Sequence, residues 1–240
     1  MNVYVINLDK NTDRLQSVSK RLLALDVPFV RISAVNGKGL SAEERNRLVS
    51  SFKWWCVRGM LPRDGEIGCA LSHLKAYRML LESQDDYCCV LEDDCQFEPN
   101  FKDQLKRIEE WIDPSRPQVV LMTNYSERNP PKTWCVMPSD GDTSAEGYVI
   151  TRKAAETILK RNFPLCMPSD LWKFWAGRRL VELYHAFPTV IPCTWKQAGY
   201  VSDVCPPGEK LIRCSDMSVL RRLVWKVMRA IGLSLSKILV

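Results

Sequence analysis

The sequence predicts an α/β fold in which a mostly parallel β-sheet is flanked by helices. Segments rich in β-forming residues alternate along the chain with segments whose apolar residues recur at helical spacing. The chain starts with a strand, a helix and a second strand in residues 2–35, which predicts a parallel pair with a right-handed crossover. An apolar run at 87–91 then leads directly into three acids, which indicates a strand covered on both faces.

The composition is that of a globular protein that binds anionic partners. With 240 residues, of which 46% are hydrophobic, the chain can bury one sizeable core or two small ones. The net charge of +6 suits phosphates, acidic glycolipids or an anionic membrane surface. Nucleic acid is not expected as a partner, because the charge is diffuse and no aromatic-rich RNA-binding motif occurs.

The cysteines and the first residues indicate a cytoplasmic protein. The ten cysteines include no CxxC pair, so we expect reduced thiols rather than a disulfide framework or a zinc ribbon. No charged start followed by an apolar stretch suggests a signal peptide, and no apolar run is long enough to cross a bilayer.

The first 37 residues predict a strand, a helix and a second strand in close succession. Residues 2–8 predict the first strand, and the polar residues at 9–13 end it. The helix that follows has an apolar stripe made of Leu15, Val18, Leu22 and Leu25. Residues 29–35 predict the second strand, followed by a turn at Asn36 and Gly37.

Two further helices are predicted before the central strand. Ser41 is expected to cap a short helix, with Glu44 completing a capping box. Residues 52–64 are aromatic and basic, and suit either a loop that contacts a substrate or part of the core. Gly65 opens a long helix whose apolar face carries Ile67, Leu71, Leu74 and Leu81. Another stripe of this helix carries Glu66, Cys69 and His73.

The second half of the chain continues the alternation. The strands expected there are 118–123, 147–150 and 180–184. Helices are expected to start at Pro99, after a cap at Thr151, and at Ser169–Asp170. The proline-containing segment 126–139 predicts a loop, and 193–213 has no clear period.

The last residues differ from the rest and predict a basic amphipathic helix. Within 217–240, the apolar stripe is Leu220, Leu223, Val224, Val227, Ile231 and Leu235. The opposite side carries Arg221, Arg222, Lys226 and Arg229. Such a helix suits a membrane interface with anionic lipid, and the alternative is a helix packed on the domain. We therefore expect a domain at 1–215 and a membrane-associating tail at 216–240.

The acids Glu92, Asp93 and Asp94 are the strongest indication of chemistry. Three neighbouring carboxylates repel one another, so a positive partner is expected beside them. A divalent cation that bridges a diphosphate fits, because carboxylate oxygens suit Mg²⁺ or Mn²⁺. Ligands of open α/β sheets bind at the carboxyl ends of strands, where these acids are predicted to lie. The alternative is a solvated acidic turn.

Five short motifs, taken together and in order, resemble glycosyltransferase family 25. They are VINLDKNTDR at 5–14, GEIGCALSH at 65–73, VLEDDCQF at 90–97, AEGYVIT at 145–151 and MPSD at 167–170. The resemblance covers about the first 200 residues. The family includes bacterial lipooligosaccharide galactosyltransferases and, more distantly, collagen galactosyltransferase domains. The sequence departs from it around Pro188 and Gln197, where a late glutamine motif is only loosely matched.

The resemblance implies a Rossmann-like GT-A fold and an inverting transfer from a UDP-sugar, usually UDP-galactose, with Mn²⁺ or Mg²⁺. The short chain is similar to the bacterial branch, so we expect a β-linkage, β-1,4 by preference, to lipooligosaccharide or lipopolysaccharide. The enzyme is then peripheral on the inner face of the cytoplasmic membrane.

Three alternatives stay open. UDP-glucose or UDP-N-acetylglucosamine could replace UDP-galactose on the same fold, or the chain could be a non-catalytic nucleotide-sugar-binding module at a membrane. A nucleotidyltransferase is less favoured, because LDKNTDR lacks the glycine-rich phosphate loop that it needs.

The same resemblance implies roles for the acids. Asp94 is expected to ligate the metal with Glu92, while Glu92 or Asp93 holds the ribose or orients the metal ligands within the catalytic cluster. Asp170, in the second acidic motif, is the candidate general base, and a helix cap is the alternative for it and for Ser169.

Further donor-binding residues are expected on the first strand and the long helix. Asn7 suits the uracil or ribose, and Arg14 a phosphate, with a surface salt bridge as the alternative for Arg14. Ser72 and His73 are expected to line the donor site or, in the case of His73, to serve as a structural hydrogen-bonder. His185 is a candidate for completing the metal shell, with a place in the core as the alternative.

Overall fold

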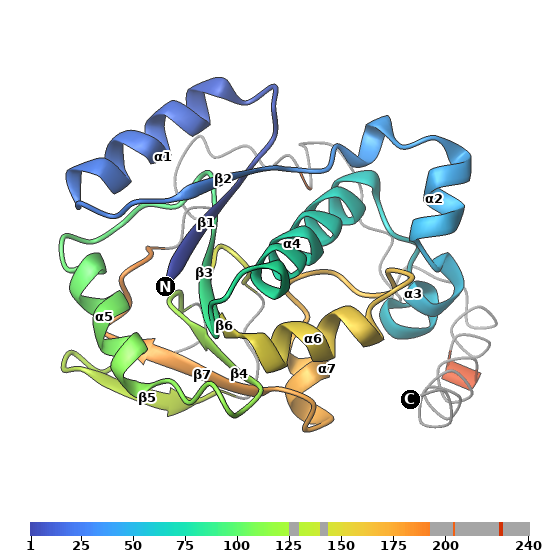
Figure 1. The fold of residues 1–240 in the computed structure, drawn as a ribbon. Coiled ribbons are helices and arrows are strands. Elements are labelled where there is room, and N and C mark those ends of the chain that lie inside the picture. Colours follow the sequence, from blue (N-terminus) through green and yellow to red (C-terminus); the bar gives the residue numbers. More distant parts are fainter. Residues whose placement is uncertain (125–129, 140–143, 193–203, 205–225, 228–240) are drawn as a thin grey trace.

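The computed structural model describes residues 1–124, 130–139, 144–192, 204 and 226–227, and these form a sheet between helices (Figure 1). Within this part of the chain the sheet has seven strands in the order β2-β1-β3-β6-β4-β7-β5. The strands are β1 (Asn2–Asn7), β2 (Val30–Ser33), β3 (Tyr87–Glu92), β4 (Gln118–Leu121), β5 (Cys135–Pro138), β6 (Gly147–Thr151) and β7 (Glu182–Phe187).

The predicted α/β fold with a mostly parallel sheet is confirmed. β1 pairs in parallel with β2 and β3, and β4 pairs in parallel with β7. β6 is antiparallel to both β3 and β4, and β5 is antiparallel to β7. β1, β2, β3, β4 and β7 therefore share one direction, and their carboxyl ends lie at one edge of the sheet.

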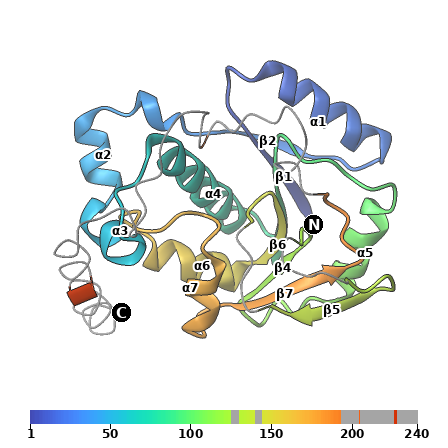
Figure 2. The same cartoon turned by 180° about the vertical axis from the view of Figure 1, so that it is seen from behind.

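Helices cover both faces of this sheet (Figures 1 and 2). They are α1 (Thr12–Ala24), α2 (Ala42–Leu48), α3 (Ser51–Arg58), α4 (Asp64–Glu82), α5 (Phe101–Trp111), α6 (Arg152–Arg161) and α7 (Trp172–Gly177), with a 3₁₀ turn η1 at Gly37–Gly39. Tyr4 and Val90 face a cluster with α4, α6 and α7, whereas Val5 and Leu91 face a cluster with α1 and α5. The alternation follows from the two-residue period of a strand.

The predicted caps hold for two helices and fail for a third. Ser41 and Glu44 form the capping box of α2, and the Thr151 hydroxyl accepts a hydrogen bond from the Ala154 amide at 3.3 Å. The helix expected at Ser169–Asp170 instead begins at Trp172, and its cap position, Leu171, makes no side-chain cap bond. The cap role considered for Ser169 and Asp170 is therefore wrong, because both residues precede the cap position.

Strand β5 and the bounds of β7 differ from the sequence-based expectation, whereas the segment 52–64 follows one of its two alternatives. Residues 135–138, expected in a loop, form the edge strand β5 by pairing with β7, a long-range contact that local periodicity does not encode. In the aromatic segment 52–64, Trp54 belongs to helix α3 and is fully buried, as the core alternative expected. The strand expected at 180–184 is shifted to 182–187 and includes His185.

The predictions about cysteines and membrane spans hold within the described residues. Cys88 and Cys89 are buried in β3, and the seven described cysteines are free thiols. Each helix of this part of the chain is too short or too polar to cross a bilayer. The predicted tail helix lies outside the described residues except for Lys226 and Val227, as do Cys193, Cys205 and Cys214.

Candidate active site at the carboxyl ends of β1 and β3

An open cleft lies where β1 and β3 end beside the first turns of α4. Its empty volume is about 790 Å³, part of which is bulk solvent. The acids Glu92, Asp93 and Asp94 line it on one side. Basic and amide side chains that also line it are Lys10, Asn11, Arg14 and Lys38. The cleft thus places acids that suit a cation beside bases that suit phosphate.

Two glycines allow α4 to approach the chain that follows β2. A Cβ at Gly68 would lie 2.5 Å from the Val35 carbonyl oxygen, and one at Gly37 would lie 1.8 Å from the Asp64 carbonyl oxygen. The Ser72 hydroxyl reinforces this joint, because it donates to the Gly68 carbonyl at 2.6 Å and accepts from the Val35 amide at 2.8 Å. Ser72 lines the cleft but is fully buried and already hydrogen-bonded, so the geometry favours a positioning role over contact with the donor.

Asp93 joins the first motif to the acidic motif. The Asn7 amide nitrogen donates to its carboxylate at 2.7 Å, and an Arg14 nitrogen lies 3.4 Å from the other oxygen. Asn7 also donates to the Asn11 carbonyl and accepts from the Arg31 guanidinium, each at 3.0 Å. Burial raises the pKa of Asp93, and the bonds to Asn7 and Arg14 act against that rise. Asn7 and Asp93 are therefore held inside the protein by this bond, and Asp93 lies between Glu92 and Asp94 in the sequence.

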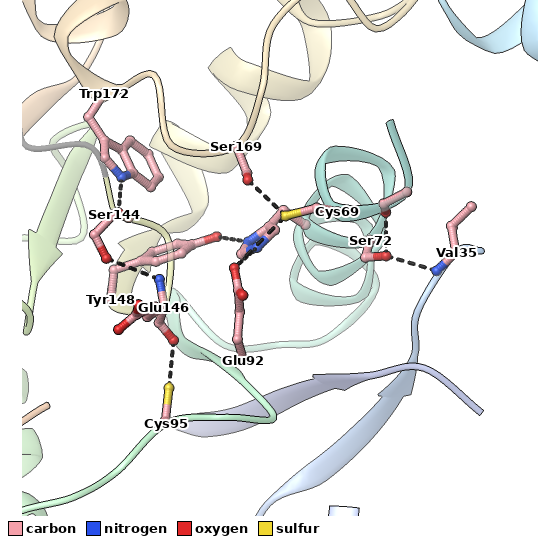
Figure 3. A network of polar contacts seen from close by, with 12 residues as sticks. Val35, Cys69, Ser72, Glu92, Cys95, Ser144, Glu146, Tyr148, Ser169 and Trp172 are labelled. Carbon is pink, nitrogen blue, oxygen red and sulfur yellow. Dashed lines mark hydrogen bonds and ion pairs between the residues drawn. The ribbon is translucent and has the colours of Figure 1, made fainter. Parts of the chain in front are cut away.

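Glu92 lies beside Cys69 of α4 (Figure 3), and His73 completes a compact cluster with these two residues. The His73 Nε2 atom lies 3.3 Å from Glu92 Oε1, and the Cys69 thiol donates to the same oxygen at 3.9 Å. The His73 Nδ1 atom lies 2.6 Å from the Tyr148 hydroxyl, which lies 2.7 Å from the Tyr77 hydroxyl. His73 is therefore both a buried hydrogen-bonder and part of the cleft wall.

The MPSD motif reaches the same cluster from the connection between α6 and α7. The Ser169 hydroxyl lies 3.2 Å from the Cys69 sulfur, and Figure 3 marks this contact with a dashed line. Removal from water raises the pKa of the Asp170 carboxyl, the charge of Arg58 lowers it, and Glu92 and Glu66 raise it further. Asp170 thus shares the electrostatic environment of the acid cluster although it is distant in sequence.

Of the other two candidates for metal ligands, Asp94 lies in the cleft and His185 lies outside the cluster of Cys69, His73 and Glu92. Asp94 is half-buried and lines the same cleft as Glu92. His185 is buried in β7, with its ring 6.0 Å from that of Phe187. Among the described residues, the group whose ligand atoms all lie within 4.8 Å of one another is Cys69, His73 and Glu92, so His185 is not a member.

Sequence reasoning gave no role to Cys69, Tyr148, Lys10 or Lys38. Cys69 and His73 are four residues apart on a helix, and this spacing was the available signal that they share a face. Tyr148 lies in a buried strand, and the bond to His73 arises only when β6 pairs beside β3. No local pattern indicates that contact.

The donor atoms at the cleft fit a divalent cation. Glu92 and Asp94 supply the hard carboxylate oxygens that Mg²⁺ and Mn²⁺ prefer, and the imidazole of His73 is a ligand that Mn²⁺ also accepts. The donor set therefore suits the group that the sequence led us to expect.

The cleft, with its acids and bases, lies at the carboxyl ends of the strands, where open α/β sheets bind their ligands. Residues 1–172 match the model of glycosyltransferase family 25 (LPS biosynthesis protein), and the chain belongs to that family.

Several curated proteins are similar to this chain. Procollagen galactosyltransferase 2 of Mus musculus is 27% identical over 236 residues, which cover 84% of this chain and 36% of that protein. Putative glycosyltransferase R655 of Acanthamoeba polyphaga mimivirus is 28% identical over 170 residues, covering 65% of this chain and 51% of that protein. The chain thus spans about a third to a half of the length of these relatives.

One solved structure has a weak likeness to the fold. It is the crystal structure of a glycosyltransferase involved in the glycosylation of the major capsid of PBCV-1, with 10% identity and a TM-score of 0.32. The match covers 68% of this chain and 66% of that chain. A score this low supports no argument about function.

Proposed function

We propose that the protein is an inverting galactosyltransferase that moves galactose from UDP-galactose to a terminal sugar of lipooligosaccharide, in a β linkage and with Mn²⁺ or Mg²⁺. The observation that carries the proposal is the convergence on one cleft of Glu92, Asp94, Arg14 and Lys38, with Asp170 nearby. Membership of family 25 and relatives that are named galactosyltransferases support the reaction class.

The charged side chains divide the task of holding the donor. Lys10, Arg14 and Lys38 offer positive charge to the diphosphate. Glu92 and Asp94 would hold the cation, which when bound neutralises charge on the departing UDP. Asp93 is anchored by Asn7 and Arg14, and so fixes the direction of the two acids beside it.

Asp170 is proposed as the general base. The acceptor hydroxyl oxygen forms a bond to C1 of galactose, the bond from C1 to the UDP oxygen breaks, and the hydroxyl proton passes to the Asp170 carboxylate. This role requires Asp170 to be ionised. Arg58 favours the ionised form, because its positive charge lowers the pKa of Asp170.

The acceptor has two candidates with different support. The family description, an LPS biosynthesis protein, favours a lipooligosaccharide sugar. The similarity to procollagen galactosyltransferases over 84% of this chain favours a procollagen acceptor as the second candidate. Glucose-ended and N-acetylglucosamine-ended oligosaccharides and procollagen, offered in parallel with UDP-galactose, would distinguish the two.

The decisive experiment compares UDP release by the protein and by its Asp94→Asn variant. With Mn²⁺, UDP-galactose and an oligosaccharide acceptor, we expect turnover that falls on the order of 10²-fold or more in the variant. Asp26→Asn, an exposed position outside the cleft, is the control and should keep full activity. UDP-glucose and UDP-N-acetylglucosamine test the alternative donors.

Two outcomes contradict the proposal. Full turnover by Asp94→Asn removes the metal role of Asp94. Binding of UDP-galactose with no UDP release from any acceptor supports the non-catalytic nucleotide-sugar-binding module instead.

We also propose that residues 216–240 associate the domain at 1–215 with the inner face of the cytoplasmic membrane. The basis is the sequence, in which a basic stripe faces an apolar one. Such a tail brings the cleft close to a lipid-linked acceptor.

A further inference from the structure

We propose that Cys69, His73 and Glu92 form a binding site for a thiophilic divalent cation such as Zn²⁺. The site shares Glu92 with the proposed donor site, but it does not depend on the transferase reaction. Cys69 and His73 are one helical turn apart on α4, and Glu92 approaches both from the end of β3. One sulfur, one nitrogen and one oxygen atom therefore lie within 4.8 Å of one another.

The spacing of these atoms is close to that of ligands around one tetrahedral ion. Zinc bond lengths place a nitrogen and an oxygen ligand about 3.3 Å apart, and a sulfur and an oxygen ligand about 3.5 Å apart. The observed separations are 3.3 Å for His73 Nε2 to Glu92 Oε1 and 3.9 Å for Cys69 Sγ to the same oxygen. A charge-assisted hydrogen bond between imidazole and carboxylate is shorter, about 2.8 Å. The separation of His73 and Glu92 therefore matches that of two ligands of one ion better than that of a tight hydrogen bond.

The contacts of the second ring nitrogen of His73, Nδ1, suit a metal-bound imidazole. A ligating histidine donates its other ring N–H to a neighbouring acceptor, which fixes its tautomer. Here Nδ1 faces the Tyr148 hydroxyl at 2.6 Å, and that hydroxyl faces Tyr77 at 2.7 Å. Because hydroxyl groups both donate and accept, this chain can serve either tautomer. With the ion bound, Nδ1–H donates to Tyr148 and Nε2 is free to coordinate.

The donor set selects the type of ion. A thiolate with an imidazole and a carboxylate is typical of Zn²⁺ and Co²⁺, whereas Mg²⁺ prefers oxygen ligands and keeps its waters. Binding forms a bond from the ion to the Cys69 sulfur and releases the thiol proton to solvent. Three protein ligands leave the fourth position to water. Because Glu92 serves both sites, binding of Zn²⁺ is expected to compete with binding of the donor-site cation.

The test is a titration of the full chain with Co²⁺ in the absence of nucleotide. We expect a sulfur-to-cobalt charge-transfer band in the near ultraviolet, which Zn²⁺ abolishes by displacement and Mg²⁺ leaves unchanged. Cys69→Ser should remove the band and weaken Zn²⁺ binding by more than about 100-fold. The matched control replaces Cys193, Cys205 and Cys214 with serine, keeps Cys69, and should keep the band.

Further measurements guard against a variant that fails to fold. X-ray absorption at the zinc edge of the unaltered protein should report one sulfur at about 2.3 Å together with lighter ligands. Glu92→Gln, checked for folding by circular dichroism, should weaken Zn²⁺ binding while Cys69 stays in place.

Absence of sulfur from the zinc shell, or a cobalt band that persists in folded Cys69→Ser, overturns the proposal. Loss of the band in the control variant overturns it as well. None of these readouts requires galactosyl transfer, so they can fail or succeed independently of the proposed function.

Discussion

At the residue scale, the protonation of Asp170 depends on charges from three different elements. Arg58 ends α3, Glu66 lies in the first turn of α4, and Glu92 ends β3. Burial is the largest influence and raises the pKa of Asp170, while the Arg58 charge opposes that rise. An Arg58 nitrogen lies 4.0 Å from Glu66, so the two charges also restrain each other.

The first prediction concerns the pH dependence of turnover. Because the proposed base must be ionised, kcat/KM should fall as the pH is lowered through the pKa of Asp170. This acid limb of the pH profile should lie at higher pH than for an ordinary aspartate, because the pKa of Asp170 is raised. Arg58→Gln removes a charge that lowers the pKa of Asp170, so the limb should move to higher pH. Glu66→Gln removes one that raises it, so the limb should move to lower pH.

The measurement is kcat/KM against pH for the unaltered protein and both variants. Shifts of opposite sign support Asp170 as the base. An acid limb that moves the same way in both variants, or stays fixed in both, contradicts that assignment.

The second prediction concerns the contact between Asn7 and Asp93. Asn7→Ala removes the 2.7 Å bond and leaves a buried carboxylate with less support, so the free energy of unfolding should fall by about 1–3 kcal/mol. Urea denaturation measures this fall. Asn100→Ala is the control, because Asn100 is exposed and makes no side-chain cap bond to α5. Equal stability of Asn7→Ala and the control would show that the buried bond contributes little.

At the element scale, the placement of α4 decides the shape of the cleft. Gly68 and Gly37 let the helix touch the chain after β2, and Ser72 bonds across the same joint. Cys69 and His73 follow within the next turns, so their position depends on this close approach.

The third prediction is that Gly68→Ala destabilises the fold, which is the opposite of the usual effect of replacing a helical glycine with alanine. Alanine normally stabilises a helix interior by about 1 kcal/mol relative to glycine. Gly68→Ala should instead destabilise the fold by about 1–3 kcal/mol, because its Cβ would lie 2.5 Å from the Val35 carbonyl oxygen. Gly177→Ala is the control, since no atom lies within 4 Å of the corresponding Cβ. Thermal unfolding of both variants tests the contrast. A Gly68→Ala protein as stable as the control would contradict it.

Elements that depend on contacts close in the sequence could be predicted, and the one that depends on a distant partner strand could not. The capping box of α2 and the cap of α6 were predicted because both lie within four residues of sequence. Strand β5 was missed because its edge pairing joins Cys135 to Phe187 and leaves no regular alternation of burial. Helix α3 was not assigned, although Gly59 in the left-handed conformation ends it in the usual way.

At the scale of the whole molecule, helices on both faces of one sheet hold the cleft at its edge. Of the two hydrophobic clusters of the described residues, one includes Leu183 of β7 and the other includes Ala186 of β7 and Ile191.

The fourth prediction concerns residues 217–240, whose sequence predicts a basic amphipathic helix. Deleting residues 217–240 should leave the melting temperature and the turnover of soluble acceptor nearly unchanged, while binding to anionic vesicles falls. Vesicle co-sedimentation, with neutral vesicles as the control, measures the effect, and high salt should weaken the binding of the full chain. Unchanged vesicle binding after the deletion would remove the membrane role of the tail. A large fall in melting temperature would favour the packed-helix alternative.

The sequence alone determined the fold class, the family resemblance and most of the elements, because alternation, helical spacing and caps are encoded locally. It also predicted roles for Asn7, Glu92, Asp93 and Asp94, because charged or amide groups that end apolar strands stand out in a chain, and for Asp170 through the family resemblance. Only the tertiary structure decided which groups meet: Asn7 with Asp93, Cys69 with Glu92, and Tyr148 with His73. The reason is that β1, α4, β3 and β6 are adjacent only in the folded sheet, so the surroundings of each side chain come from residues distant in sequence.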